Sequence, residues 1–474
     1  MSRVAVLVAG AICIGLCLFG IRGRMGYNPI KVSQAYYCED PFLNQLGVNP
    51  VFNLLTSTLD DNRKENRTLH LMSEEDALSK VQKYLHRQGI DWLSPIARKV
   101  EREGTPNRRN VVLVFMESMS ANLMGTFGSD KKLTPYLDSL YQQSLSFSHF
   151  YSSGIHTNHG IYSTLYSFPA IMKRNAMKGS VIPVYSGLPT VLQENGYCNL
   201  FFMTHESQYD NMNAFLRTNG FDEIYAQENY PSEKVVNSFG VQDDFMYQYA
   251  LPILNERAGT GNPFFSVLLS ISNHPPYVIP PYFHPHSDVL EEQIVEYADW
   301  SIRQFMQAAE KQPWFDNTIF VFLGDHGKMV GTPECEMPQS YNHIPLMIYG
   351  KDIKPGVYDG FGGQVDVSPT LLGLLNISYL QNNFGVNLLE EERPCMFFTA
   401  DNLIGARDSV NMFIYSPDSQ QEFKYKLEEG KLHAATGTDE EAFRNLKDYC
   451  FSMLQSTESL VKEHKTLDKV SVKK

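Results

Sequence analysis

The sequence lacks a paired cysteine motif. No two of its seven cysteines are separated by only two residues, and they stand at Cys13, Cys17, Cys38, Cys198, Cys335, Cys395 and Cys450. Because closely spaced cysteine pairs hold most thiolate-ligated metals, we do not expect a zinc or iron–sulfur site built from cysteines. The odd count and the wide spacing do not form a disulfide framework either, and they leave the redox compartment open.

Basic residues are also in deficit. The chain has 40 Lys and Arg against 53 Asp and Glu, which gives a net charge of −13. An acidic surface argues against nucleic acid as the main partner. It does not argue against a phosphate substrate, because a bound divalent cation can dominate the local field. We find no internal repeat and no low-complexity segment, and the length of 474 residues predicts two or three structural units.

One long apolar run is present, and it lies at the N-terminus. Residues Val4 to Ile21 carry no charge, Arg3 precedes them, and Arg22 and Arg24 follow. A signal peptide and a membrane anchor both fit such a run, but Leu-Phe-Gly-Ile-Arg is a poor cleavage site. We therefore expect an uncleaved transmembrane anchor over residues 1–24, or the last span of a longer membrane region. The flanking charges do not orient it.

The segment that follows predicts a helical connector over residues 25–109. Ser73 before Glu-Glu-Asp is typical of a helix start, an apolar face runs from Ala77 to Leu85, and Gly89 is expected to close this helix. The charged stretch Arg98–Arg109 is interpreted as a linker into the main domain.

From residue 110 the pattern changes to apolar, β-branched runs that alternate with helical segments. This alternation predicts an α/β fold with a mainly parallel sheet flanked by helices over 110–381. The expected strands are Val111–Met116, Tyr197–Thr204, Phe264–Ser272, Thr318–Leu323 and Ile344–Tyr349, and the expected helices are Thr134–Gln143, Leu188–Glu194, Glu291–Lys311 and Val367–Leu375.

The last part of the chain, residues 382–474, predicts a small C-terminal α+β subdomain. It would contain short strands at Met396–Thr399, Met412–Tyr415 and Glu422–Leu427 and a closing helix over Asp439–His464. It is expected either to be an antiparallel appendage or to form the far edge of the same fold.

Polar residues follow two of the predicted strands directly. Glu117 ends the first strand, and Asp325 and His326 follow Leu323 and Gly324. Ligands of open parallel sheets bind beyond the carboxyl ends of the strands. Two carboxylates and an imidazole at one edge suit Mn²⁺, Zn²⁺ or Mg²⁺. A simple strand-end cap remains the alternative for Glu117.

A glycine-bounded polar loop, Gly154 to Gly160, runs into a helical stretch that begins near Thr157. Backbone N–H groups at a helix start favour a phosphoryl anion, and a hydroxyl group there can act as a nucleophile beside a metal. The residues alone equally allow Thr157 to be only a helix N-cap.

Ordered motifs resemble the sulfatase-like branch of the alkaline-phosphatase superfamily, and more closely the lipoteichoic acid synthase and phosphoglycerol transferase family. The resemblance covers about residues 110–376. The motifs are Met116-Glu-Ser118, Leu133–Asp138, Gly154…Thr157…Gly160, Phe201…Tyr209-Asp-Asn-Met212…Asn219–Asp222, Ser272-Asn-His-Pro275, Gly324-Asp-His-Gly327 and Gln364–Thr370.

This resemblance implies that Glu117, Thr157, Asp325 and His326 hold one divalent metal ion, most often Mn²⁺ with Mg²⁺ or Zn²⁺ as alternatives. Thr157 would be the catalytic nucleophile and would carry a phospho-threonine intermediate. The implied substrate-binding residues are His274, His343, Tyr209 and Asn211. For His274, a turn histidine before two prolines remains an alternative. For His343, a second metal ligand and a residue with no functional role remain alternatives. We interpret His156, His159 and His205 as pocket-wall or surface residues.

Two departures concern the head group. His156 stands where relatives often have arginine, and Met212 stands where polymerising relatives carry a substrate-binding arginine. The Cys/Ser-x-Pro-x-Arg nucleophile motif of true sulfatases is absent at Thr157, which disfavours sulfate-ester hydrolysis.

The resemblance therefore implies an extracytoplasmic transferase that moves a phosphoglycerol-type group from a phospholipid donor to a glycan or lipid acceptor, on a chain anchored in the cell membrane. A phosphoethanolamine transferase or phosphodiesterase of the same superfamily is the nearest alternative. A catalytically silent envelope-binding module is the alternative from another class, and the intact Glu, Thr and Asp-His set argues against it.

Overall fold

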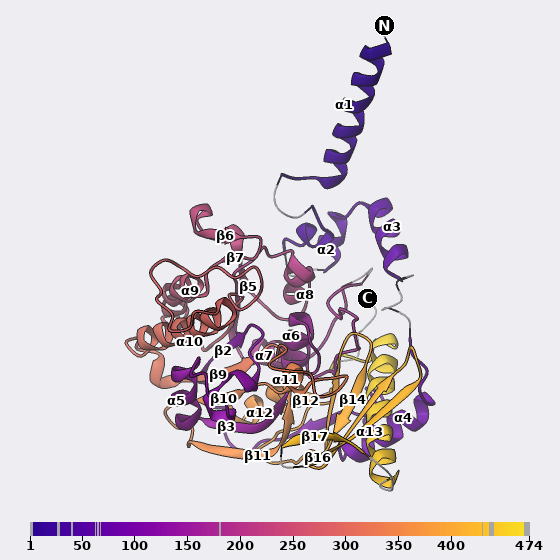
Figure 1. The fold of residues 1–474 in the computed structure, drawn as a ribbon, viewed down its shortest axis with the longest axis vertical. Coiled ribbons are helices and arrows are strands. Elements are labelled where there is room, and N and C mark those ends of the chain that lie inside the picture. Colours follow the sequence, from indigo (N-terminus) through magenta and orange to yellow (C-terminus); the bar gives the residue numbers. More distant parts are fainter. Residues whose placement is uncertain are drawn as a thin grey trace.

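The computed structural model describes residues 3–25, 29–38, 41–61, 63, 66, 68–179, 182–428, 430–435 and 440–468 (Figure 1). The N-terminal run forms the helix α1 (Arg3–Arg22), which projects from one side of a rounded body. By length and composition α1 can cross a membrane, and none of its residues is buried.

The body is built on a sheet of eight strands in the order β11-β3-β10-β9-β2-β8-β4-β5. Seven of these strands run parallel to one another, and β10 runs against them between β3 and β9. The strands are β2 (Asn110–Met116), β3 (Leu145–Tyr151), β4 (Cys198–Met203), β5 (Glu223–Tyr225), β8 (Phe264–Leu269), β9 (Thr318–Gly324), β10 (Leu346–Tyr349) and β11 (Gly356–Gly363). The α/β fold with a mainly parallel sheet is thus confirmed.

The apolar run of β2 explains why the sheet lies in the middle of the molecule. Val111, Leu113 and Phe115 enter one core and Val112 and Val114 the other, because successive side chains of a strand point to opposite faces. Helices cover both faces: α5 (Pro135–Gln143), α9 (Asp243–Ala258) and α10 (Leu290–Ala309) contribute to the second core, and α6 (Thr157–Tyr166), α7 (Leu188–Glu194), α8 (Met212–Thr218) and α12 (Val367–Leu374) to the first.

The C-terminal part forms a separate antiparallel sheet in the order β13-β14-β15-β16-β17. Its strands are Met396–Thr399, Ile404–Arg407, Asn411–Ser416, Gln421–Glu428 and Lys431–Ala434. Helix α13 (Glu440–Lys462) packs on β14 and β15 and on α4 (Glu74–Tyr84) of the connector. The antiparallel appendage is therefore the arrangement found, and Asp439, the expected first residue of α13, lies outside the described residues.

Two local predictions are wrong. Ser73 does cap α4, since its side chain accepts a hydrogen bond from the Asp76 N–H, but the helix ends at Tyr84 rather than at Gly89. His86 already has a positive φ of 50°, so the chain leaves the helix before it reaches the glycine. The supposed linker after Arg98 contains β1 (Arg98–Val100), which pairs with β12 (Tyr379–Gln381).

Candidate active site and metal centre

The ends of β2 and β9 bring the predicted acidic residues together. The two strands are neighbours in parallel register, with Met116 beside Gly324. The chain therefore leaves both strands at the same edge, where Glu117 and Asp325 follow directly. The Asp325 N–H donates to the Met116 carbonyl at 3.2 Å, which holds the two turns against each other.

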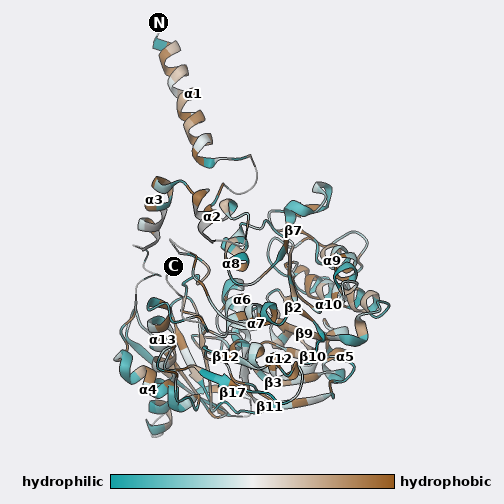
Figure 2. Ribbon diagram, turned by 180° about the vertical axis from the view of Figure 1, so that it is seen from behind, coloured by the Kyte–Doolittle hydropathy of each residue, from teal (hydrophilic) through white to brown (hydrophobic). Residues whose placement is uncertain are grey.

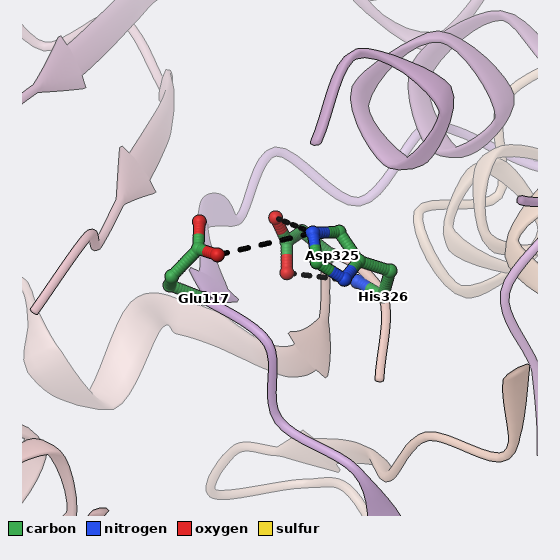
Figure 3. A group of neighbouring side chains, drawn as sticks. All are labelled: Glu117, Asp325 and His326. Atoms are coloured by element: carbon green, nitrogen blue, oxygen red, sulfur yellow. Dashed lines mark hydrogen bonds and ion pairs between the residues drawn. The ribbon is translucent and has the colours of Figure 1, made fainter. Parts of the chain in front are cut away.

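Glu117, Asp325 and His326 form a compact group with one candidate ligand atom from each, all within 4.8 Å of one another (Figure 3). His326 Nε2 lies 3.8 Å from Glu117 Oε1 and 3.5 Å from Asp325 Oδ2. Its Nδ1 lies 2.7 Å from the Gly327 carbonyl, which can only accept a hydrogen bond. Nδ1 therefore donates a hydrogen bond, which leaves Nε2 on the side of the two acids, as in a metal-binding histidine.

Backbone and hydroxyl donors fix the carboxylates. Asp325 Oδ1 accepts the N–H groups of Ser118 and His326, each at 2.8 Å, and Glu117 Oε1 accepts the Ser118 hydroxyl at 2.7 Å. Ser118 adopts a positive φ of 51°, a conformation that costs a non-glycine residue free energy. The turn after β2 thus bears local strain where it orients both acids.

The burial and the charges of Glu117 and Asp325 indicate a site for a cation. Glu117 is 1% exposed and Asp325 is fully buried. Burial first, and then the charge of Asp325, raise the pKa of Glu117 well above its ordinary value. Asp325 Oδ2 has no hydrogen-bond partner among the described residues. A buried carboxylate oxygen without a hydrogen bond, beside a second acid and the His326 imidazole, fits a divalent metal ion, which would neutralise the pair.

Thr157 lies next to this group. It is the first residue of α6, and its hydroxyl oxygen lies 3.5 Å from Glu117 Oε2. The N-cap of α6 is His156, whose carbonyl accepts the N–H groups of His159 and Gly160. The alternative in which Thr157 is only a cap is therefore wrong, and its hydroxyl faces the acids.

Close packing holds α6 against the end of β9. A Cβ atom on Gly160 would lie 2.2 Å from the carbonyl oxygen of Asp325, so only glycine allows this approach. Gln364 completes the frame, because its side-chain nitrogen donates to the carbonyls of Gly324 and Asp325 and its oxygen accepts the Ser153 N–H.

Among the predicted substrate-binding residues, Tyr209 has both acids among its electrostatic neighbours. Burial and the neighbouring Asp210 raise the pKa of Tyr209 to about 12, and Glu117 and Asp325 contribute to the rise. Its ring lies 4.6 Å from that of His205. His274 packs on Phe239 at 4.2 Å, with Nδ1 2.6 Å from the Pro275 carbonyl, which leaves Nε2 for a ligand.

The other two predicted substrate residues make structural contacts. His343 Nε2 lies 2.9 Å from the Ser148 carbonyl and its ring stacks on Tyr151, and burial lowers its pKa to about 4. Asn211 donates to the Met177 carbonyl at 2.8 Å. A role in binding substrate stays a prediction for both. Met212, at the position of the missing arginine, is fully buried in the first core.

The three remaining histidines differ from one another. His159 and His205 are buried rather than exposed, and burial lowers their pKa values to about 3 and about 4. His205 Nε2 has no hydrogen-bond partner among the described residues. His156 Nε2 lies 2.5 Å from Asp401 Oδ1, which brings the C-terminal part of the chain to the residue before Thr157.

Sequence reasoning missed Lys328. Its ammonium group donates to Asn273 Oδ1 at 2.6 Å, and Asn273 in turn donates to the carbonyls of Glu117 and Ser118. Burial lowers the pKa of Lys328 to about 8. This half-enclosed cation beside the acids suits an anionic substrate. Its position directly after Asp-His-Gly is the signal that could have identified it.

The comparisons agree with this geometry. The family model described as Sulfatase matches residues 109–377. Lipoteichoic acid synthase-like YvgJ from Bacillus subtilis is 25% identical over 69% of this chain and 56% of that protein. Lipoteichoic acid synthase from Staphylococcus aureus (strain bovine RF122 / ET3-1) is 23% identical over 74% of this chain and 58% of that protein. The chain thus spans less than two thirds of the length of these curated relatives.

Solved structures share the fold. A protein in the alkaline phosphatase superfamily from Vibrio parahaemolyticus has a TM-score of 0.75 at 25% identity, covering 83% of this chain and 97% of that one. The lipoteichoic acid synthase LtaP from Listeria monocytogenes has a TM-score of 0.65 at 22% identity, covering 81% and 98%. The chain has the fold of the alkaline phosphatase superfamily. Because the Sulfatase family model matches more than half of the length of this chain, the chain belongs to the sulfatase family.

Proposed function

We propose that this chain is a metal-dependent transferase that moves a phosphoglycerol-type group from a phospholipid to an acceptor in the cell envelope. The observation that carries the proposal is the position of the Thr157 hydroxyl, 3.5 Å from Glu117 in the group that also contains Asp325 and His326. The similarity to lipoteichoic acid synthases supports the choice of reaction.

Glu117, Asp325, His326 and Thr157 would hold one divalent metal ion, with Mn²⁺ preferred and Mg²⁺ or Zn²⁺ as alternatives. When bound, this ion supplies charge stabilisation to the Thr157 oxygen and to the phosphoryl group. The carboxylates are acceptors only and the His326 Nε2 offers a lone pair, so no ligand has to lose a backbone bond to take up the ion.

The reaction has two displacements. The Thr157 hydroxyl loses its proton as its oxygen attacks the phosphorus of the donor lipid, the bond from phosphorus to the diacylglycerol oxygen breaks, and that oxygen takes up a proton. His274, with Nε2 available, is the proposed partner of the leaving oxygen. An acceptor hydroxyl then loses its proton and attacks the phosphorus of the phospho-threonine, the bond from phosphorus to the Thr157 oxygen breaks, and that oxygen takes up a proton. Lys328, Tyr209 and Asn211 are the proposed contacts of the phosphoryl and head groups.

The N-terminal helix fits a membrane enzyme. We propose that α1 anchors the chain and that the domain built on the eight-stranded sheet lies outside the cytoplasm, where phospholipid head groups and envelope acceptors are available. A signal sequence would pass the same test of length and apolarity, and detection of the uncleaved chain in the membrane fraction would distinguish the two.

The test uses the full chain in vesicles that contain phosphatidylglycerol or phosphatidylethanolamine, with Mn²⁺ or Mg²⁺. We expect diacylglycerol release from phosphatidylglycerol that is lost in Thr157→Ala and kept in the control Thr260→Ala, an exposed position at the end of α9. Release from phosphatidylethanolamine alone would favour the phosphoethanolamine transferase. Free glycerol phosphate as the sole product would indicate a phosphodiesterase, and unchanged release in Thr157→Ala would exclude the nucleophile.

A further inference from the structure

Exposed large apolar side chains are concentrated near the N-terminus. Among the described residues, those outside α1 gather mainly between residues 25 and 59, and the rest of the body contributes only scattered ones. Helix α3 (Pro50–Asp61) carries five of them, Val51, Phe52, Leu54, Leu55 and Leu59, with exposed fractions between 41% and 68%. A surface of this kind on a folded chain marks a contact site.

The apolar side of α3 points in the opposite direction to that of a helix packed on a protein core. Successive helical residues turn by about 100°, so the five apolar side chains share about half of the circumference. Asn53 lies on the opposite side and is only partly exposed, whereas the apolar side points outward. An amphipathic helix normally turns its apolar side to the core. The apolar side of α3 is therefore directed away from the body.

The position of α3 identifies what covers it. Helix α1 leaves the body on the side where α2 (Pro41–Leu46) and α3 lie (Figure 1), and it is apolar between its terminal residues Arg3 and Arg22 (Figure 2). None of it is buried. Leu43 and Leu46 of α2 are exposed as well. The apolar side of α3 thus continues the surface that begins with a helix able to cross a bilayer.

We propose that α3, with Leu43 and Leu46 of α2, is a membrane-contact surface whose apolar side chains enter the head-group region of the bilayer beside α1. The sequence of α3 contains no basic residue. Attachment therefore depends on apolar burial rather than on attraction to anionic lipids. Neither the reaction nor the metal is needed for this contact.

The surface is linked to the candidate site. Arg24, just after α1, forms an ion pair with Glu206, whose side chain is 6% exposed. The buried Asn213 side chain donates to the Tyr36 carbonyl at 3.0 Å. Glu206 and Asn213 flank Tyr209, so the segment between α1 and α3 is fastened to the wall of the site. Contact of α3 with lipid would set the height of Thr157 above the bilayer.

The experiment places a tryptophan on α3 of the full chain. Leu55→Trp and, separately, Leu54→Trp are reconstituted into phosphatidylcholine vesicles with and without lipids brominated near the head group, and the emission of the parent chain is subtracted. Val410→Trp, an exposed position between β14 and β15, is the matched control. We expect emission from both α3 variants at shorter wavelength and quenched by the brominated lipid, and emission from the control that is neither shifted nor quenched.

Each other outcome overturns the proposal. Emission at long wavelength without quenching would mean that α3 faces water. Emission at short wavelength without quenching would mean that protein, such as a second copy of this chain or a further membrane segment, covers α3. Because no variant touches Thr157 or the acids, a negative result here leaves the proposed reaction standing, and loss of that reaction leaves this result unaffected.

Discussion

At the scale of single residues, Glu117 and Asp325 form an unfavourable pair for the fold unless a cation lies beside them. Two carboxyl groups are removed from water within one small group, and the Lys328 ammonium group bonds to Asn273. Taking charges out of water costs several kcal/mol for each ion unless a partner compensates. A divalent cation held by both carboxylates would be such a partner.

We expect Mn²⁺ to raise the melting temperature of the chain, because an ion that binds only the folded state adds about 2.7 kcal/mol at 100 times its dissociation constant. Glu117→Gln should lose most of this increase, since it removes one charged ligand atom from the site. Calorimetry with and without Mn²⁺ measures this increase in melting temperature. Glu310→Gln, at an exposed residue after α10, should keep the full increase. Equal increases in both variants would contradict the site.

The sequence predicted some site residues and could not predict others. Glu117, Asp325 and His326 stand directly after strands, so strand adjacency alone brings them together. The His156–Asp401 contact joins residues that are 245 positions apart, and no local pattern encodes it. Lys328 directly follows a predicted motif, but its bond to the Asn273 side chain joins residues 55 positions apart, and only the fold brings them together.

At the scale of elements, the contact between α6 and β9 sets the distance from Thr157 to the acids. Gly160→Ala would place a methyl group 2.2 Å from the Asp325 carbonyl oxygen, which forces the helix away from the strand. We expect a loss of stability of about 1 to 3 kcal/mol, typical of overpacking, and a loss of Thr157-dependent diacylglycerol release.

The matched control for that change is Gly356→Ala, where a Cβ atom would meet nothing within 4 Å. It should melt and react like the parent chain. If Gly160→Ala keeps full activity, α6 can shift without moving Thr157, and the proposed frame around the nucleophile is wrong.

The buried carboxylate of Asp299, at the start of α5, makes the stability of the protein depend on pH. Asp299 of α10 accepts the N–H groups of Tyr136 and Leu137, at 3.0 and 2.8 Å. Burial raises the pKa of Asp299 from its ordinary 3.8 to about 7. The folded state therefore binds this proton more tightly than the unfolded state does, and the contribution of Asp299 to stability falls as pH rises from 3.8 to about 7.

Asp299→Asn carries no titrating proton, so the free energy of unfolding of this variant should fall less than that of the parent over the same pH range. Urea unfolding at several pH values between these limits measures the two slopes. The variant also loses one acceptor for the two N–H groups, which lowers its stability at every pH without changing the slope. Identical slopes would show that Asp299 does not titrate in this range.

Helices and strands were predicted well where a regular apolar pattern marks them. They were predicted poorly where side-chain hydrogen bonds to the backbone end or obscure that pattern. The strand expected to extend to Ser272 stops at Leu269, because the N–H groups of Ile271 and Ser272 bond to Asp243. Strand β3 was missed because its polar residues, such as Ser146 bonded to the Tyr141 carbonyl, obscure the apolar alternation. Helix α9 was missed because Pro252 lies inside it, and a proline normally marks the end of a helical pattern.

At the scale of the whole molecule, the expected boundary between residues 381 and 382 crosses a dense set of bonds. Asn382 donates to the Lys465 and Leu467 carbonyls, beyond the end of α13. Arg393, before the C-terminal sheet, donates to both oxygens of Asp366 at 2.6 and 2.7 Å and also contacts the Tyr449 hydroxyl of α13. The sequence pattern predicts two separate parts, but these polar bonds and a shared apolar core join them.

Arg393→Met tests whether these parts unfold together. Both members of the ion pair are buried, so the change leaves the Asp366 charge without its cation, and the N–H groups of Gly363 and Val386 alone remain bonded to it. Loss of one partner of a buried ion pair costs about 3 to 5 kcal/mol. We expect calorimetry to show a melting temperature well below that of the parent and of Arg444→Met, an exposed position on α13. We also expect a single transition, because the ion pair joins the turn after β11, at one edge of the large sheet, to the segment before the C-terminal sheet and to α13. Two separate transitions would instead mean that the C-terminal part is an independent domain and that His156 meets Asp401 only across a mobile interface.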